Sequence, residues 1–181
     1  IRDNFSELEF TQNQNIRQGS LGKPNSILDG IQSLPHQDEG LLWMQQMWLS
    51  GMKGALLADD MGLGKTFQAL AFISWVKELM DKGVLERKPM LVVAPVVLLK
   101  NWNQEYNKFF DTTIFGQLTE LHGDNLKFYK NIKNAKEFSI KRETDLRDIS
   151  SINNVIKKGN GLLLEINKLV KSSLILTTYE T

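Results

Sequence analysis

Two glycines, a lysine and a threonine follow an apolar run in residues 56–66, which read LLADDMGLGKT. Gly62 and Gly64 permit positive φ angles and let backbone N–H groups come close to a ligand. A helix that begins directly after them would place its free N–H groups and its positive dipole end at the same spot. Lys65 could then reach the terminal phosphates of a nucleotide, and the Thr66 hydroxyl could bind Mg²⁺. The spacing therefore predicts a phosphate-binding loop.

The match to the general pattern G-x-x-x-x-G-K-[ST] is incomplete, because Asp59 stands where the first glycine belongs. A glycine-rich turn that only joins a strand to a helix is the alternative reading. Residues 54–58 are apolar and predict a short strand, while residues 66–80 have helical spacing. This order of strand, glycine loop and helix favours the phosphate loop over the plain turn.

The rest of the chain predicts the elements that must position this loop. The expected helices are residues 38–52, 66–80 and 97–109, and the expected strands are residues 54–58, 90–94, 117–121 and 174–178. Alternating strands and helices are typical of an α/β fold with an open parallel sheet. The first 33 residues are polar, and we expect an irregular lead-in there, either a plain linker or a partly ordered segment. Three tryptophans near the loop are expected to pack against their neighbours: Trp43, Trp48 and Trp75.

Composition limits the class of protein and of site. The chain has 181 residues, which suits one domain or one lobe of a larger protein. Its formal net charge of +1 argues neither for nor against a nucleic-acid partner. The sequence has no cysteine, which excludes disulfides and thiolate metal sites, and with two histidines a histidine-based metal site is not expected.

No segment of the sequence is apolar enough to cross a membrane. The longest apolar run, residues 90–99, contains Pro95 and falls short of the about 20 residues that a membrane span needs. We therefore expect no membrane partner. No signal peptide is visible, so we expect a protein of the bacterial cytoplasm, or of the cytosol or nucleus in a eukaryote. The first residue is isoleucine, and we expect a piece of a longer chain.

One segment differs from the rest in charge. Residues 126–158 contain nine lysines and arginines against four acidic residues. We predict a helical, exposed segment, insertion-like in character, that extends over about 124–160. A solvated charged face is one interpretation. The other is a flank that touches nucleic-acid phosphates.

Several stretches of the chain resemble one family when they are taken together with the loop. They read LPHQDEGLLWM in residues 34–44, LVVAPVVLLKNWNQEYNKF in 91–109, LHG in 121–123 and LILTTYET in 174–181. This set resembles the Swi/Snf family of helicase-like ATPases, within helicase superfamily two. The resemblance is close over residues 34–109, returns at 174–181 and is weak between them. It implies that residues 34–181 are the first RecA-like ATP-binding lobe, with a parallel sheet flanked by helices.

The family's form D-[DE]-M-G-L-G-K-T also accounts for the aspartate in place of glycine. The resemblance implies ATP and Mg²⁺ as cofactors and assigns Lys65 to catalysis and Thr66 to the metal. Gln37 matches the glutamine that reads adenine, a task that suits an amide because it donates and accepts at once. A surface glutamine before a helix is the alternative, and His36 is expected to be a packing residue. The nucleotide-binding residues are Gln37, Asp59, Asp60, Met61, Gly62, Leu63, Gly64, Lys65 and Thr66.

Six further residues match the family's DNA-contacting motifs, three after the strand 90–94 and three at the end of the strand 174–178. They are Pro95, Lys100, Asn101, Thr177, Thr178 and Tyr179. Backbone amides at a helix start and a lysine suit contacts with phosphates. Hydroxyls at the exit of a parallel strand face the edge where open sheets bind ligands. For the second group, a β-branched strand end without a ligand is the alternative.

The resemblance implies that ATP binds between this lobe and a second RecA-like lobe, and that the full protein couples ATP hydrolysis to movement along double-stranded DNA. A protein bound to that DNA is a further candidate partner. The family places a D-E-x-H carboxylate pair soon after T-T-Y-E, and no such string occurs in the printed sequence. We therefore expect a lobe truncated before these carboxylates, which binds nucleotide weakly and does not hydrolyse it at a useful rate.

Two other functions stay open on the sequence alone. One is another P-loop enzyme, such as a small-molecule kinase or a GTPase, which DNA would not stimulate. The other is a non-catalytic module that keeps the RecA-like fold as a dock for DNA or protein. In that case, replacing Lys65 by alanine would have no effect on activity in the cell.

Overall fold

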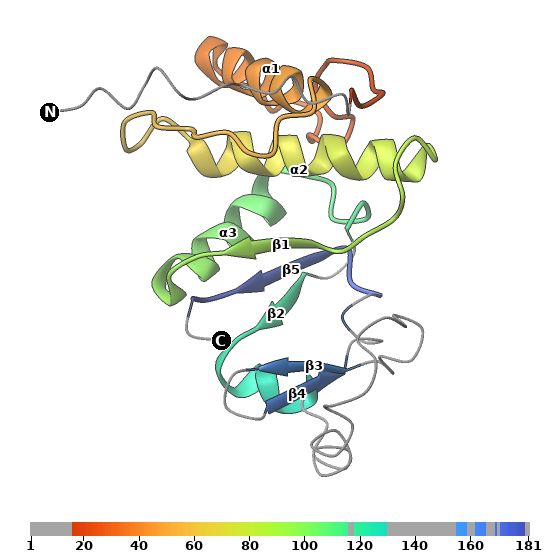
Figure 1. Ribbon diagram of the computed structural model, residues 1–181. Helices are drawn as coiled ribbons and strands as arrows, with labels where there is room; N and C mark the ends of the chain where they lie inside the picture. Colours follow the sequence, from red (N-terminus) through yellow and green to blue (C-terminus); the bar gives the residue numbers. More distant parts are fainter. Residues whose placement is uncertain are drawn as a thin grey trace, which may run out of the picture. The chain divides into compact units, whose positions relative to one another are not determined.

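The computed structural model describes residues 16–115, 118–129, 155–158, 162–165, 169 and 171–179. The chain divides into two compact units, Ile1–Leu85 and Glu86–Thr181. Each unit is described by itself below. Figure 1 shows their helices and strands coloured along the sequence. In the described part of the chain, no helix is both long and apolar enough to cross a bilayer.

The first unit is built on two helices, α1 (Pro35–Leu49) and α2 (Lys65–Asp81), which lie side by side (Figure 1). The helix predicted over residues 66–80 is thus confirmed, and the one predicted over 38–52 begins three residues earlier. Pro35 starts α1 because its fixed φ suits the first helical position, where no N–H partner is needed. The helix α1 stops before Gly51, whose φ is +81°.

Apolar side chains pack between the two helices. The packing face of α2 is largely apolar and includes Leu70, Trp75 and Leu79, all nearly inaccessible to solvent. Trp48 of α1 meets Phe72 of α2 edge to face, with ring centroids 6.0 Å apart. The predicted packing role of Trp48 and Trp75 is confirmed by these contacts. The two helices therefore form one small core around their shared face.

Residues 16–33, here called the strap, form no helix or extended strand, yet they bind both helices. The backbone N–H of Arg17 donates to the Leu49 carbonyl oxygen at the end of α1. The indole Nε1–H of Trp75 in α2 donates to the Ser20 carbonyl oxygen over 2.8 Å. The strap is thus an ordered part of this unit over the residues that the structure describes. The domain boundary expected after residue 33 stays a prediction.

The second unit contains a parallel sheet of β1 (Met90–Val93), β5 (Leu174–Thr177) and β2 (Thr119–Leu121), in the order β1-β5-β2. All four residues of the central strand β5 are buried. Helix α3 (Val96–Phe109) packs against β5, and the short 3₁₀ helix η2 (Gly123–Tyr129) packs against β2. The strands expected over residues 90–94, 117–121 and 174–178 and the helix expected over 97–109 are confirmed within one or two residues, except that Gln117 lies outside the described part.

A separate antiparallel pair, β3 (Val155–Lys158) with β4 (Leu162–Glu165), follows in the same unit (Figure 1). The prediction of a helix up to residue 158 is therefore wrong for 155–158. The β-branched Val155 and Ile156 favour a strand, and the nearby segment Leu162–Glu165 pairs with it as an antiparallel ladder. Residues 130–154, which contain most of the basic charge, lie outside the described part of the chain.

The strand predicted over residues 54–58 is also wrong, because these residues have no regular secondary structure. A strand is stabilised by the ladder to a neighbour. The ladders that the structure describes join β1 with β5, β5 with β2 and β3 with β4, and none of them includes residues 54–58. Leu56 accordingly has 82% of its surface exposed. An apolar run alone was not sufficient to make a strand here.

Candidate functional site

The predicted phosphate loop has the backbone conformation that its glycines were expected to provide. Gly62 and Gly64 have φ angles of +89° and +76°, and Gly64 is the N-cap of α2. The first N–H groups of a helix have no acceptor within the helix and point along its axis. The loop therefore brings the positive end of α2 and free N–H groups to one place, as an anion site requires.

Lys65 is the first residue of α2 and folds back over this loop. Its ammonium group donates to the carbonyl oxygens of Asp59 and Asp60, the latter over 2.9 Å. An ammonium group has three N–H donors, and these two bonds hold the charge above the loop that begins with Asp59. The arrangement puts one positive charge beside the start of α2.

Thr66 occupies the second position of α2 and is half-buried. Within the described residues, its hydroxyl makes no hydrogen bond, so it is available as a ligand. The same residues contain no cluster of three or more histidine or acidic side chains that could hold a metal ion. The predicted contact of Thr66 with Mg²⁺ stays a prediction.

Gln37, from the third position of α1, lies directly on the loop. Its Nε2 donates to the Leu63 carbonyl oxygen over 3.2 Å, and its Oε1 accepts the backbone N–H of Leu34. A Cβ atom added to Gly64 would stand 2.3 Å from that Nε2. Gly64 is thus required both for its positive φ and for the approach of Gln37. The predicted adenine contact of Gln37 stays a prediction.

His36 does not have the packing role that was expected. Its Nε2 lies 3.0 Å from the Leu63 carbonyl oxygen, the same atom that Gln37 binds. A carbonyl oxygen only accepts, so this contact requires the hydrogen on Nε2. Two consecutive side chains of α1 therefore hold the loop by one carbonyl group. The pattern of apolar residues could not reveal this, because the contact joins segments 27 positions apart.

Gln68 is a supporting residue that sequence reasoning missed. It is fully buried, and its Nε2 donates to a carboxylate oxygen of Asp59 over 3.4 Å. Its Oε1 lies so close to α1 that a Cβ on Gly40 would stand 2.0 Å from it. Since the Asp59 carbonyl also accepts from Lys65, Gln68 supports the aspartate that holds the lysine. The sequence offered one indication of this role, because Gln68 is a polar residue on the apolar face of the predicted helix.

The other predicted loop residues lie at the surface. Met61 is 95% exposed and Leu63 40% exposed, so neither side chain contributes to a core. Their part in a phosphate site would come from the backbone. The side chain of Asp60 is exposed as well, while its carbonyl oxygen binds Lys65.

The predicted DNA-contacting residues all lie in the second unit. Pro95 is the N-cap of α3 and is exposed, as are Lys100 and Asn101 in the first turns of that helix. Val96 and Val97 between them are 60% and 76% exposed. This helix start therefore presents backbone amides and one lysine to solvent, as phosphate contacts require.

The second predicted group, at the end of β5, is divided between core and surface. The Thr177 hydroxyl is buried and donates to the Leu121 carbonyl oxygen over 2.8 Å, which ties β5 to β2. Thr178 is half-buried, and Tyr179 is 77% exposed. For Thr177 this geometry favours the alternative of a structural strand end, whereas Tyr179 is accessible to a ligand.

A groove of about 390 Å³ runs along α3 in the same unit and is lined by Lys100, Asn103, Glu120 and His122, among others. Glu120 accepts hydrogen bonds from Asn103 over 3.2 Å and from Asn125 over 3.4 Å. His122 Nε2 lies 3.5 Å from Glu120. The LHG stretch thus belongs to a polar network on the α3 side of β2.

The comparisons with known proteins agree with this geometry. A family model described as "SNF2-related domain" matches residues 36–181. The chain is 35% identical to Zorya protein ZorD of Escherichia coli over its whole length, which covers 16% of that protein. It is 38% identical to ATP-dependent helicase FUN30 of Saccharomyces cerevisiae over 49% of this chain and 7% of that protein. The chain therefore spans a small part of the relatives that it matches.

A solved structure matches the fold of both units. It is the SWI2/SNF2 ATPase core of Sulfolobus solfataricus in complex with double-stranded DNA, with 29% sequence identity and a TM-score of 0.53. The match covers 90% of this chain and 24% of that chain. The α/β fold with a parallel sheet is thus RecA-like, as expected. Because the family model covers more than half of the sequence, this chain belongs to the SNF2-related domain family and has the fold of its first, RecA-like lobe.

Proposed function

We propose that this chain is the ATP-binding lobe of a DNA-dependent ATPase that moves along double-stranded DNA. The observation that carries the proposal is the closed phosphate loop, with Lys65 above it and Gln37 seated on Gly64. An anion site at a helix start, a mobile ammonium group and an adjacent amide are the groups that a Mg-ATP complex needs. Membership of the family supports ATP over other nucleotides.

Each residue has a distinct part in this proposal. Lys65 leaves the carbonyl oxygens of the loop and binds the β- and γ-phosphates, which lowers the barrier to phosphoryl transfer by stabilising negative charge. Thr66 contributes its hydroxyl to Mg²⁺, and the remaining ligands are phosphate oxygens and water. Gln37 pairs with the adenine edge. Gln68 keeps Asp59 in place and thereby positions Lys65.

The proposed partners are double-stranded DNA, a second RecA-like lobe and a protein bound to the DNA. The Sulfolobus neighbour, solved with double-stranded DNA, supports the first of these. The exposed start of α3, with Lys100 and Asn101, supports a contact with the phosphate backbone. A location with the chromosome, in the bacterial cytoplasm or in a nucleus, accords with such a partner.

The test is ATP hydrolysis by the full-length gene product with and without duplex DNA. We expect DNA to raise kcat, because movement along DNA couples the two sites. A small-molecule kinase or GTPase would show no such stimulation. A non-catalytic dock would bind DNA without hydrolysis, and Lys65→Ala would leave its activity in the cell unchanged.

Gln37→Ala should lower the affinity for ATP by about tenfold and leave the affinity for GTP nearly unchanged. A buried hydrogen-bonding pair that loses one partner costs about 1–2 kcal/mol, which is about a tenfold change in affinity. Equilibrium titration with both Mg-nucleotides measures the ratio. An equal loss for both nucleotides would show that Gln37 supports the loop and does not read the base.

Lys100→Glu should weaken DNA binding and lower the slope of log K against log salt by about one, since one phosphate contact is lost. Lys108→Glu, at the other end of α3, is the matched control because it makes the same change of charge on the same helix. Fluorescence anisotropy at several salt concentrations gives both slopes. If the slopes of log K against log salt are equal for the two variants, the proposed phosphate contact at the start of α3 is wrong.

A further inference from the structure

We propose that the strap, residues 16–33, is a positioning element of the nucleotide site that holds α1 so that Gln37 stands over the phosphate loop. This inference rests on the proposed function of Gln37. The family model begins at residue 36, so the strap lies before the matched region. Its bonds reach the end, the middle and the beginning of α1, one after another.

At the end of α1, Arg17 covers the last turn. Its guanidinium carbon lies 3.9 Å from the ring centroid of Trp48, and its Nη1 donates to the Trp48 carbonyl oxygen over 2.7 Å. A second, longer bond reaches the Met52 carbonyl oxygen at 3.3 Å. The carbonyl groups of a last helical turn lack partners within the helix, and a cation there also suits the helix dipole. One arginine thus fixes the far end of the helix.

In the middle of α1, Gln45 joins the helix to the strap backbone by a reciprocal pair of bonds. Its Nε2 donates to the Gly22 carbonyl oxygen over 2.6 Å, and its Oε1 accepts the Gly22 N–H over 3.0 Å. Gln45 is fully buried. A buried amide with both groups satisfied specifies one arrangement, since any shift leaves polar groups without partners. This pair therefore sets the position of α1 along the strap.

At the beginning of α1, the strap binds the residue next to Gln37. Lys23 Nζ lies 2.8 Å from Asp38 Oδ2, and the Ser33 hydroxyl donates to Asp38 Oδ1. Desolvation raises the pKa of Asp38, but the hydrogen bonds from Lys23 and Ser33 and the charge of Lys23 outweigh it and lower that pKa. Two residues of the strap, one from its middle and one from its end, thus bind one carboxylate in the first turn. Gln37, next to Asp38 in this turn, is the residue that binds the Leu63 carbonyl oxygen of the loop.

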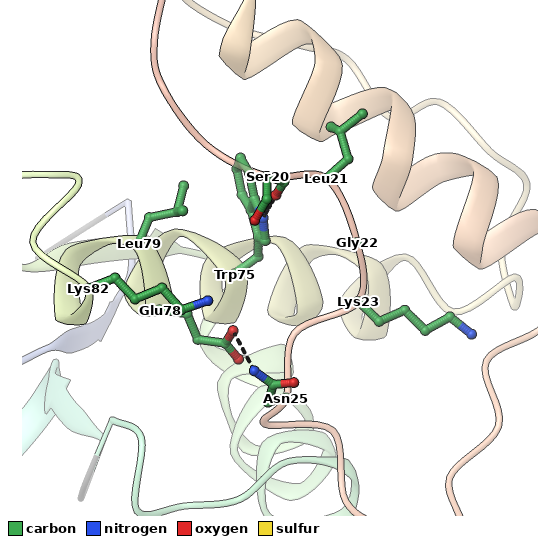
Figure 2. A pocket seen from close by; sticks show the side chains of 9 residues that line it. All are labelled: Ser20, Leu21, Gly22, Lys23, Asn25, Trp75, Glu78, Leu79 and Lys82. Carbon is green, nitrogen blue, oxygen red and sulfur yellow. Dashed lines mark hydrogen bonds between the residues drawn. The ribbon is translucent and has the colours of Figure 1, made fainter.

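The strap is also attached to α2, which carries Lys65 and Thr66. Figure 2 shows the strap passing across α2, with Asn25 hydrogen-bonded to Glu78. Glu78 also accepts the Ser26 N–H over 3.3 Å. A cleft of about 200 Å³ lies between the strap and this part of α2. The bonds to Gln45, Asp38 and Glu78 are the directed contacts of the strap that single substitutions can remove.

Binding of three ligands to the full-length gene product tests the inference: ATP, GTP and inorganic tripolyphosphate, each with Mg²⁺. Gln45→Leu should lower the ratio of ATP to GTP affinity by about fivefold, because α1 no longer fixes Gln37, which corresponds to the loss of part of one hydrogen bond. The affinity for tripolyphosphate should fall much less, because Lys65, Thr66 and the start of α2 keep their places when α1 loosens. Arg17→Ala changes a half-buried side chain at the other end of α1 and should act in the same direction, which keeps the test open if Gln45→Leu fails to fold.

Two controls sharpen the result. Arg17→Lys keeps a cation over Trp48 and should retain most of the ratio, whereas Lys53→Ala changes an exposed lysine of the same unit and should retain all of it. An equal loss for all three ligands would overturn the inference, because the strap would then only stabilise the fold. If the ratio of ATP to GTP affinity falls in Gln37→Ala but not in the strap variants, the positioning role of the strap is wrong and the adenine contact stands. A ratio unchanged in Gln37→Ala overturns the proposed adenine contact and the inference together.

Discussion

Lys65→Ala in the full-length gene product should lower kcat for DNA-stimulated ATP hydrolysis by about a hundredfold or more, the usual effect of removing a donor aimed at transition-state charge. The ammonium group is held above the loop by the carbonyl oxygens of Asp59 and Asp60, so it can transfer to the phosphates without a rearrangement of α2. Steady-state hydrolysis at saturating DNA and ATP measures the loss.

Lys77→Ala is the matched control for this substitution. Lys77 lies on the same helix and forms an ion pair with Asp81, well away from the loop. We expect its kcat to stay within about twofold of the unmodified protein, since an ion pair near the surface contributes little. If both lysine variants lost activity to the same degree, the effect would belong to the stability of α2 and the assignment of Lys65 to catalysis would fail.

Gly64→Ala should reduce ATP binding far more than Gly62→Ala, although both residues have positive φ angles. An alanine in the left-handed region costs about 1–2 kcal/mol at either position. At Gly62 nothing lies within 4 Å of the added Cβ, so this strain is the whole effect. At Gly64 the Cβ would also stand 2.3 Å from Gln37 Nε2 and displace it.

Calorimetric titration with Mg-ATP compares the two alanine variants. We expect a loss of about tenfold for Gly62→Ala and a further loss of at least about tenfold for Gly64→Ala. Thermal unfolding of both variants shows how much of each effect is strain in the fold. Similar losses at the two positions would mean that the contact between Gln37 and the loop has no part in binding.

The elements with a clear periodic pattern could be predicted from the sequence. Helix α2 has an apolar face at helical spacing and a glycine before it, and the strand β5 is a continuous apolar run, as a central parallel strand should be. The positive φ angles at Gly62 and Gly64 also followed from the order of residue types around Lys65, while phosphate binding there stays a prediction. In each case, the information lies within a window of about 10–15 residues.

The strand expected over residues 54–58 shows where that window fails. Apolar residues make a strand only when a neighbouring strand offers a ladder, and ladders join segments that are distant in the sequence. Leu56 satisfies the local pattern but has no such neighbour in the described part of the chain. The pair β3 and β4 was missed for a different reason, because charge composition alone favoured a helix although the pairing segments are close in the sequence.

The contacts that position the site could not be predicted for a related reason. Gln45 binds Gly22, Gln68 binds Asp59 and His36 binds the loop, and each bond joins a side chain to a group in another segment. No spacing rule encodes such bonds. A buried polar residue on an apolar helix face is the one local signal, and both Gln45 and Gln68 provide it.

The close contact between Gly40 of α1 and Gln68 of α2 bears on how movements pass between the two helices. A Cβ atom on Gly40 would stand 2.0 Å from Gln68 Oε1, so the backbone of α1 and the Gln68 side chain of α2 are in close contact there. A shift of α1 along α2 must therefore move the buried Gln68 amide, which also binds Asp59 of the loop. We expect a movement of the loop to reach α1 at Gly40 through this one side chain.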